Sequence, residues 1–249
     1  MTFLDIAHVG PVELRTPALE ATARFFVDQL GFSMVQRGGD AILVRTWDDY
    51  QRFTLRLVAS AQPGVGRIYL RTTDEEALAR RVLAVREADL GGDWLPPADG
   101  VGRAYAFDGP GGHAYGLYHD VAWHQPAPGE APALKNQAAP FPGRGANVRR
   151  LDHVNVLSPD VPSDSAFAAD VLGALPSERI VLDDGTVSGI WYHVTNKSYD
   201  LVWTNDWTGS RARLHHLAFA TDTRDDILRA ADVCLEAGIH IETGPHKHA

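Results

Sequence analysis

Three histidines on apolar, strand-like segments are the residues of this sequence best suited to metal chemistry. His215 and His216 are adjacent in the run RLHHLAFA at Arg213–Ala220, and His153 lies in the run LDHVNV at Leu151–Val156. Because side chains alternate across a strand, we expect His215 and His216 to point to opposite faces. One of them could then converge with His153 on a single metal ion, although either histidine alone fits a structural role.

Length, composition and charge restrict the class of protein. The 249 residues are enough for one large domain or two small ones, and 45% hydrophobic with 22% charged residues is ordinary for a globular protein. A net charge of −9 argues against nucleic acid and anionic membrane surfaces as partners. No apolar run approaches about 18 residues, and the N-terminus lacks a signal-peptide pattern, so we expect a cytoplasmic protein.

Apolar periodicity and turn residues divide the chain into units that share one order: a strand, a helix and three strands. The first unit has a strand over Val9–Thr16 and a helix that ends at Gly31, and the second unit begins at Arg67. The same order starts again at Leu151, and the fourth unit stops after a helix that Gly238 ends. The sequence therefore predicts an α+β fold of four βαβββ modules, with the last module truncated.

A segment rich in Pro, Gly and Ala separates the two halves of the repeat. Residues 125–147 show neither helical nor strand periodicity, which is typical of a linker or an ordered crossover. We therefore predict an N-terminal domain of two modules over residues 1–124 and a C-terminal domain over residues 148–249, joined by this linker.

Alignment of the modules shows that His153 and His216 have no histidine counterpart in the first half of the chain. The openings of modules one and three match as VELRTP and VNVLSP, and those of modules two and four match likewise. In this register His153 corresponds to Pro11, and His216 corresponds to Ile68. The first half has the same architecture without imidazoles, which indicates that the two histidines have a role other than packing.

Three motifs of the second half resemble those of one enzyme family. They are LDHV at residues 151–154, RLHHL at residues 213–217 and GPHKH at residues 244–248. Their order and spacing are similar to those of the type I extradiol ring-cleavage dioxygenases of the catechol 2,3-dioxygenase group, in the vicinal oxygen chelate (glyoxalase and bleomycin resistance) superfamily. The resemblance spans essentially the whole chain. It implies that paired modules form two open-barrel domains, of which the C-terminal one holds the metal.

The resemblance also implies a mononuclear Fe(II) site. His153 and His216 match the family's histidine ligands, which leaves His215 for a structural hydrogen bond. Two imidazoles and one carboxylate hold Fe(II) while leaving positions open for substrate and O2. The family's carboxylate is a glutamate on the last strand of the fourth module, and the sequence ends before that strand. We therefore expect a piece of a longer protein, the alternative being an intact protein that cannot complete the ligand set.

Four further residues are implicated in catalysis or substrate binding by the same resemblance. His248 matches a histidine that donates to substrate or oxygen, and Tyr199 stands where the family commonly has a histidine in a Lys-x-His-Asp context. A tyrosine, with an ordinary pKa of about 10, is a poorer base than a histidine at about 6.5, so His246 or His248 could carry more of the proton transfer. Trp191 could form an aromatic wall of the pocket or belong to the core.

The expected activity is therefore opening of a catechol-type ring next to its diol, with O2 and a small aromatic diol as substrates. The resemblance also implies a homo-oligomer. Two alternatives exist on the same fold. One is a protein that binds an aromatic ligand without turnover, which the missing carboxylate favours, and the other is a glyoxalase-like metal-dependent isomerase.

Overall fold

The computed structural model describes residues 4–135 and 142–246, and its elements follow the predicted modular order. The first half consists of β1 (Ile6–Thr16), α1 (Leu19–Arg24), the π-helical turn η1 (Phe25–Gln29), β2 (Ser33–Gly38), β3 (Ala41–Arg45), β4 (Leu55–Ala59), β5 (Gly64–Thr72), α2 (Glu75–Glu87), β6 (Asp93–Leu95), β7 (Ala104–Asp108) and β8 (Ala114–Tyr118). The second half consists of β9 (Arg150–Ser158), α3 (Val161–Ala166), the π-helical turn η2 (Phe167–Val171), β10 (Leu175–Val181), β11 (Val187–His193), β12 (Leu201–Asn205), β13 (Arg213–Ala220) and α4 (Arg224–Glu236). The βαβββ order, with a fourth module of one strand and one helix, is confirmed.

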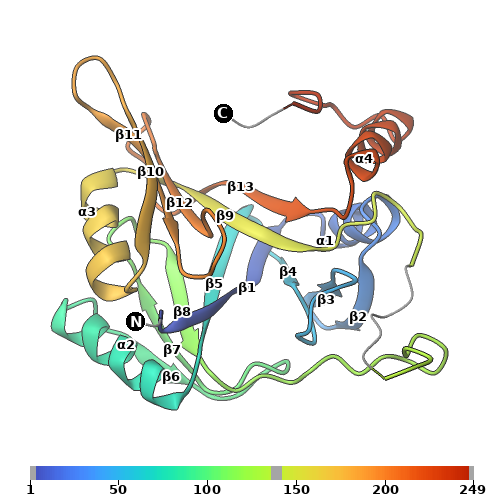
Figure 1. The fold of residues 1–249 in the computed structure, drawn as a ribbon, viewed down its shortest axis with the longest axis horizontal. Helices are drawn as coiled ribbons and strands as arrows, with labels where there is room; N and C mark the ends of the chain where they lie inside the picture. Colours follow the sequence, from blue (N-terminus) through green and yellow to red (C-terminus); the bar gives the residue numbers. More distant parts are fainter. Residues whose placement is uncertain (1–3, 136–141, 247–249) are drawn as a thin grey trace.

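The strands form two curved sheets, one from each half of the chain (Figure 1). The eight-stranded sheet has the order β2-β3-β4-β1-β5-β8-β7-β6, and the five-stranded sheet has the order β10-β11-β12-β9-β13. In both sheets the first strands of two successive modules pair antiparallel, and the last strand of a complete module pairs parallel with the first strand of that module. Neither sheet closes on itself, so the architecture is the predicted α+β fold with open barrels.

Polar side chains cap the beginnings of α2, α3 and α4, whereas α1 has Ala18 at this position and no side-chain cap. Asp74 Oδ1 accepts a hydrogen bond from the amide of Ala77 at 2.6 Å at the start of α2. The first helix begins at Leu19. Thr16 ends β1, and its hydroxyl accepts a hydrogen bond from the amide of Ala18 at 3.1 Å just before this helix. No helix among the described residues is long and apolar enough to cross a membrane.

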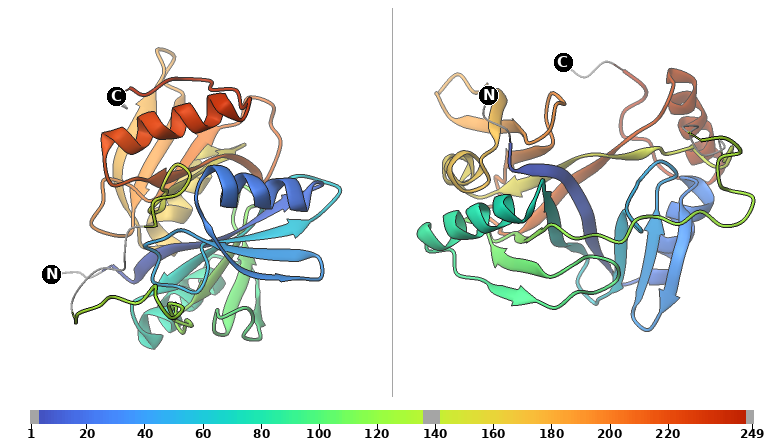
Figure 2. Two further views of the ribbon diagram at one scale, coloured as in Figure 1. Left: turned by 90° about the vertical axis from the view of Figure 1, so that its right-hand side faces the viewer. Right: turned by 60° about the horizontal axis from the view of Figure 1, so that its bottom comes forward.

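One hydrophobic core joins the two sheets. Its buried residues come from both halves and include Val12, Ile68, Leu151, Val154 and Trp203. The helix α4 packs against η1 of the first module, which adds a second contact between the halves (Figure 2). The predicted domain boundaries at residues 124 and 148 stay a prediction, and the core extends across them.

Candidate metal centre

The two histidines that the repeat analysis selected converge on one face of the second sheet. His216 on β13 pairs with Asn155 on β9, and His153 lies two residues before Asn155, on the same face of β9. Diagonal neighbours in an antiparallel pair are within reach of long side chains. The Nε2 atoms of His153 and His216 lie 3.1 Å apart, and their ring centroids are separated by 5.3 Å.

This separation fits two ligands of one octahedral metal ion. Two nitrogen atoms that each lie about 2.1 Å from a metal and subtend a right angle are about 3.0 Å apart. The observed distance between the Nε2 atoms of His153 and His216 is 3.1 Å. Within residues 4–135 and 142–246, no group of three His, Cys, Asp or Glu side chains is placed to hold a metal. The third, carboxylate ligand therefore stays a prediction.

His215 does not turn to the opposite face, and in this respect the prediction is wrong. Leu214 pairs with Val156 and His216 pairs with Asn155, so His215 is an extra residue without a partner on β9. Such a β-bulge breaks the alternation of side chains and can redirect one of them. The Nδ1 atoms of His215 and His216 lie 2.7 Å apart. His215 therefore contacts His216 at Nδ1, the ring nitrogen on the side away from His153. The hydrogen-bonding partner of His215 is thus His216.

A second bulge lies before His153. Ala218 pairs with His153 and Phe219 pairs with Leu151, which leaves Asp152 unpaired on β9. Asp152 Oδ2 lies 2.9 Å from Nδ1 of His153, and this hydrogen bond, with a contribution from the charge of Lys197, lowers the pKa of Asp152. Sequence reasoning missed Asp152, because strict alternation places it on the face away from His153. The position of Asp152 directly before His153 in the LDHV motif is the sequence feature that could have indicated this contact.

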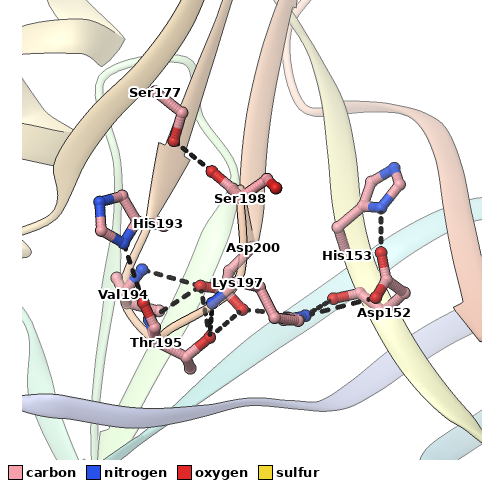
Figure 3. A network of polar contacts seen from close by, with 9 residues as sticks. All are labelled: Asp152, His153, Ser177, His193, Val194, Thr195, Lys197, Ser198 and Asp200. Carbon is pink, nitrogen blue, oxygen red and sulfur yellow. Dashed lines mark hydrogen bonds and ion pairs between the residues drawn. The ribbon is translucent and has the colours of Figure 1, made fainter. Parts of the chain in front are cut away.

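The hairpin turn between β11 and β12 carries Tyr199 to the histidine pair. Asp200, 1% exposed, closes this turn by accepting hydrogen bonds from the amides of Val194 at 2.8 Å and Thr195 at 2.9 Å (Figure 3). The rings of Tyr199 and His153 meet edge to face, with centroids 4.8 Å apart. Burial, together with the charges of Asp152 and Glu178, raises the pKa of Tyr199, so its phenol keeps its proton at neutral pH.

A row of paired residues across four strands places Trp191 on the histidine face. Trp191 on β11 pairs with Val202 on β12, Val202 pairs with Asn155 on β9, and Asn155 pairs with His216 on β13. Laterally paired residues share a face of the sheet. Trp191 is 8% exposed and is as buried as its neighbours on β11, Ile190 and Tyr192. Trp191 is thus a buried residue on the histidine face, and its role as a pocket wall stays a prediction.

Asn155 and His193 share this face and were not assigned by sequence reasoning. Asn155 is buried, and its Oδ1 accepts a hydrogen bond from the hydroxyl of Thr204 at 3.0 Å. His193 lies two residues after Trp191 on β11, and its Nδ1 is 2.8 Å from the carbonyl oxygen of Thr195. The spacing of two residues from His153 and from Trp191 is the signal that could have identified them.

Of the two C-terminal histidines in the GPHKH motif, the structure describes His246. His246 is exposed, and its Nδ1 lies 2.8 Å from the carbonyl oxygen of Gly244 in its own segment. His248 lies outside the described residues. Their predicted roles in proton transfer and substrate binding therefore stay predictions.

Comparison with known proteins agrees with the fold and the motifs. The profile of the glyoxalase/bleomycin resistance protein/dioxygenase superfamily matches residues 150–249. The chain is 32% identical over 244 residues to a metapyrocatechase from Geobacillus stearothermophilus, which covers 98% of this chain and 74% of that protein. It is 35% identical over 247 residues to a manganese-dependent 2,3-dihydroxybiphenyl 1,2-dioxygenase from Geobacillus genomosp. 3, over 98% of this chain and 78% of that protein.

Solved structures show the same fold over nearly the whole chain. The 2,3-dioxygenase LapB from Pseudomonas sp. KL28 superposes with a TM-score of 0.90 at 21% identity, over 99% of this chain and 86% of that one. Homoprotocatechuate 2,3-dioxygenase from Brevibacterium fuscum, in complex with 3,4-dihydroxyphenylacetate, gives a TM-score of 0.85 at 24% identity, over 99% and 74% of the two chains. From the identity and coverage of its curated relatives, the chain belongs to the extradiol dioxygenase family within the glyoxalase/bleomycin resistance protein/dioxygenase superfamily.

Proposed function

We propose that this protein opens a catechol-type aromatic ring next to its diol, using O2, at a mononuclear Fe(II) held by His153 and His216. The observation that carries the proposal is the 3.1 Å approach of the two Nε2 atoms on a sheet face that also bears Trp191. The names of the two Geobacillus relatives support an aromatic diol as substrate. When bound, the metal would supply a Lewis acid that binds the diol oxygens and brings O2 beside the ring.

The side chains of this protein then position the substrate and handle its protons. Trp191 flanks the histidine face and would hold the ring of the diol against it, which lowers the entropic cost of alignment. Tyr199 lies beside His153, and its raised pKa makes it a hydrogen-bond donor rather than a base. In this proposal the phenol donates to an oxygen of the substrate, and deprotonation of the diol falls to another group, for which His246 and His248 are our candidates.

The choice of Fe(II) over Mn(II) is part of the proposal. Two imidazoles and a carboxylate accept several divalent ions, and selectivity comes from geometry and metal availability as well as affinity. One relative is named manganese-dependent, so both ions are to be tested. A homo-oligomeric assembly and a cytoplasmic location also stay predictions.

The decisive experiment is an anaerobic reconstitution of the full-length protein. The metal-free protein is loaded with Fe(II) or Mn(II), mixed with catechol, an alkylcatechol or 2,3-dihydroxybiphenyl, and then exposed to O2. We expect a yellow ring-opened product and stoichiometric O2 uptake with at least one diol. Tight binding of diols without a product would favour the ligand-binding alternative, and isomerisation of another substrate would favour the glyoxalase-like one.

Replacement of Tyr199 by phenylalanine tests the proton donor. We expect kcat to fall about 100-fold, the lower end of the range for general acid–base groups, while metal content stays at the wild-type level. Tyr192→Phe is the matched control, because the Tyr192 hydroxyl contacts Ser165 at 2.8 Å and its ring lies in the core on the other face. Equal kcat in the Tyr199 variant and the wild type would remove Tyr199 from the mechanism.

A further inference from the structure

We propose that Asp152 is the residue that positions His153 for metal binding, by fixing which ring nitrogen carries the proton and how the ring is turned. The inference rests on the proposed function, since it concerns the same metal site. It goes beyond the ligand set, because Asp152 would act on the metal only through His153. Three features of the structure carry it: the bulge, the carboxylate contact and the clamp formed by Lys197.

The bulge is what allows two adjacent residues of a strand to touch. In a regular strand the side chains of Asp152 and His153 would lie on opposite faces and could not meet. Asp152 has no pairing partner on β13, whereas Leu151 and His153 pair with Phe219 and Ala218. The extra residue redirects the carboxylate toward the imidazole, as bulges beside functional sites commonly do.

The contact between Asp152 and His153 settles the tautomer of the ring. An ionised carboxylate can only accept hydrogen bonds, so Nδ1 of His153 must donate across the 2.9 Å to Oδ2. A neutral imidazole that carries its proton on Nδ1 has a lone pair on Nε2. That Nε2 is the atom directed at Nε2 of His216, 3.1 Å away. Asp152 therefore leaves the lone pair of His153 Nε2 available to a metal ion. At many metal sites a carboxylate that does not touch the metal orients a histidine ligand in this way.

Lys197 holds the bulge in place through contacts with Asp152 and Asp200. Its ammonium donates a hydrogen bond to the carbonyl oxygen of Asp152 and lies 3.7 Å from the Asp152 carboxylate. The same ammonium pairs with Asp200 at 2.9 Å, and Asp200 is buried in the turn that carries Tyr199. Figure 3 shows Lys197 lying between Asp200 and Asp152, with His153 beyond Asp152. The backbone of the bulge and the Tyr199 turn are thus held by one cation.

The experiment compares Mn(II) binding by the full-length wild type and two variants, followed by the loss of the free Mn(II) signal in electron paramagnetic resonance. We expect Asp152→Ala to raise the dissociation constant about 10- to 100-fold. Asp152→Asn keeps an acceptor oxygen, and its affinity for Mn(II) should fall about tenfold or less. Asp170→Ala removes an exposed carboxylate from η2 and should bind Mn(II) as the wild type does. An Asp152→Ala dissociation constant within twofold of the wild type would overturn the proposal.

A second readout separates positioning from mere stabilisation. Long-range proton–nitrogen spectra of metal-free protein labelled with ¹⁵N-histidine report the tautomer of His153 directly. We expect the Nδ1–H form in the wild type and a mixture of tautomers in Asp152→Ala, whose thermal unfolding midpoint serves as the folding check. The Nε2–H form in the wild type would refute the assignment. These spectra need no turnover, so a wild type that binds Mn(II) but opens no catechol would contradict the proposed function while leaving the role of Asp152 testable.

Discussion

Replacement of His216 by alanine is expected to abolish stable metal binding and, with it, ring opening. Binding of a zinc ion by four protein ligands contributes about 10–16 kcal/mol, so one ligand corresponds to about 3 kcal/mol and loss of His216 to a roughly 100- to 1000-fold weaker metal affinity. Nε2 of His216 lies 3.1 Å from Nε2 of His153, so the substitution removes one of the two nitrogen atoms proposed to hold the metal. The measurement is metal content after dialysis, together with the dissociation constant for Mn(II).

The matched control is His215→Ala, one residue earlier in the same strand. His215 reaches only the Nδ1 side of the His216 ring, at 2.7 Å, and both side chains are exposed. We expect metal affinity to fall about tenfold, the lower end of the range for residues that orient a ligand. A larger loss in His215→Ala than in His216→Ala would show that the assignment of the ligand within this pair is wrong.

Replacement of Asp200 by alanine is expected to cause a large loss of stability. The variant would leave the amides of Val194 and Thr195 without their acceptor and the ammonium of Lys197 without its buried partner. Breaking a buried pair by removing one partner typically costs about 3–5 kcal/mol, and we expect the free energy of unfolding to fall by that amount. Urea unfolding of the metal-free protein at neutral pH measures it.

Asp184→Ala provides the comparison for Asp200→Ala. Asp184 also accepts a backbone hydrogen bond in a hairpin turn, from the amide of Thr186 at 2.8 Å, but its side chain is exposed to water. Water replaces the lost acceptor there, so the unfolding curve should stay close to that of the wild type. If the free energy of unfolding fell by similar amounts in both variants, burial of Asp200 would not explain its contribution to stability. Folded Asp200→Ala protein should also turn over more slowly, because the same turn places Tyr199 beside His153.

The modular order of the fold could be read from the sequence because each element has a local signal. Alternating and helical periodicities, with glycines at the ends of helices, predict three βαβββ units and a fourth unit that stops after its helix, and the described residues have this order. The repeat also selected His153 and His216 by comparison with Pro11 and Ile68, and these two side chains meet. Both results depend on patterns along the sequence, namely the period of each segment and the match between modules.

The surroundings of the two histidines could not be read in this way, and only the tertiary structure determined them. Alternation along a strand assumes one partner for each residue, but a bulge is a property of two paired strands and leaves no mark in the period of either. For this reason the contacts of His215 with His216 and of Asp152 with His153 contradict the alternation rule. The clamp by Lys197 likewise joins residues 45 positions apart. The sequence alone identified the two imidazoles that face each other. Pairing between distant strands determined which side chain contacts Nδ1 of each of them.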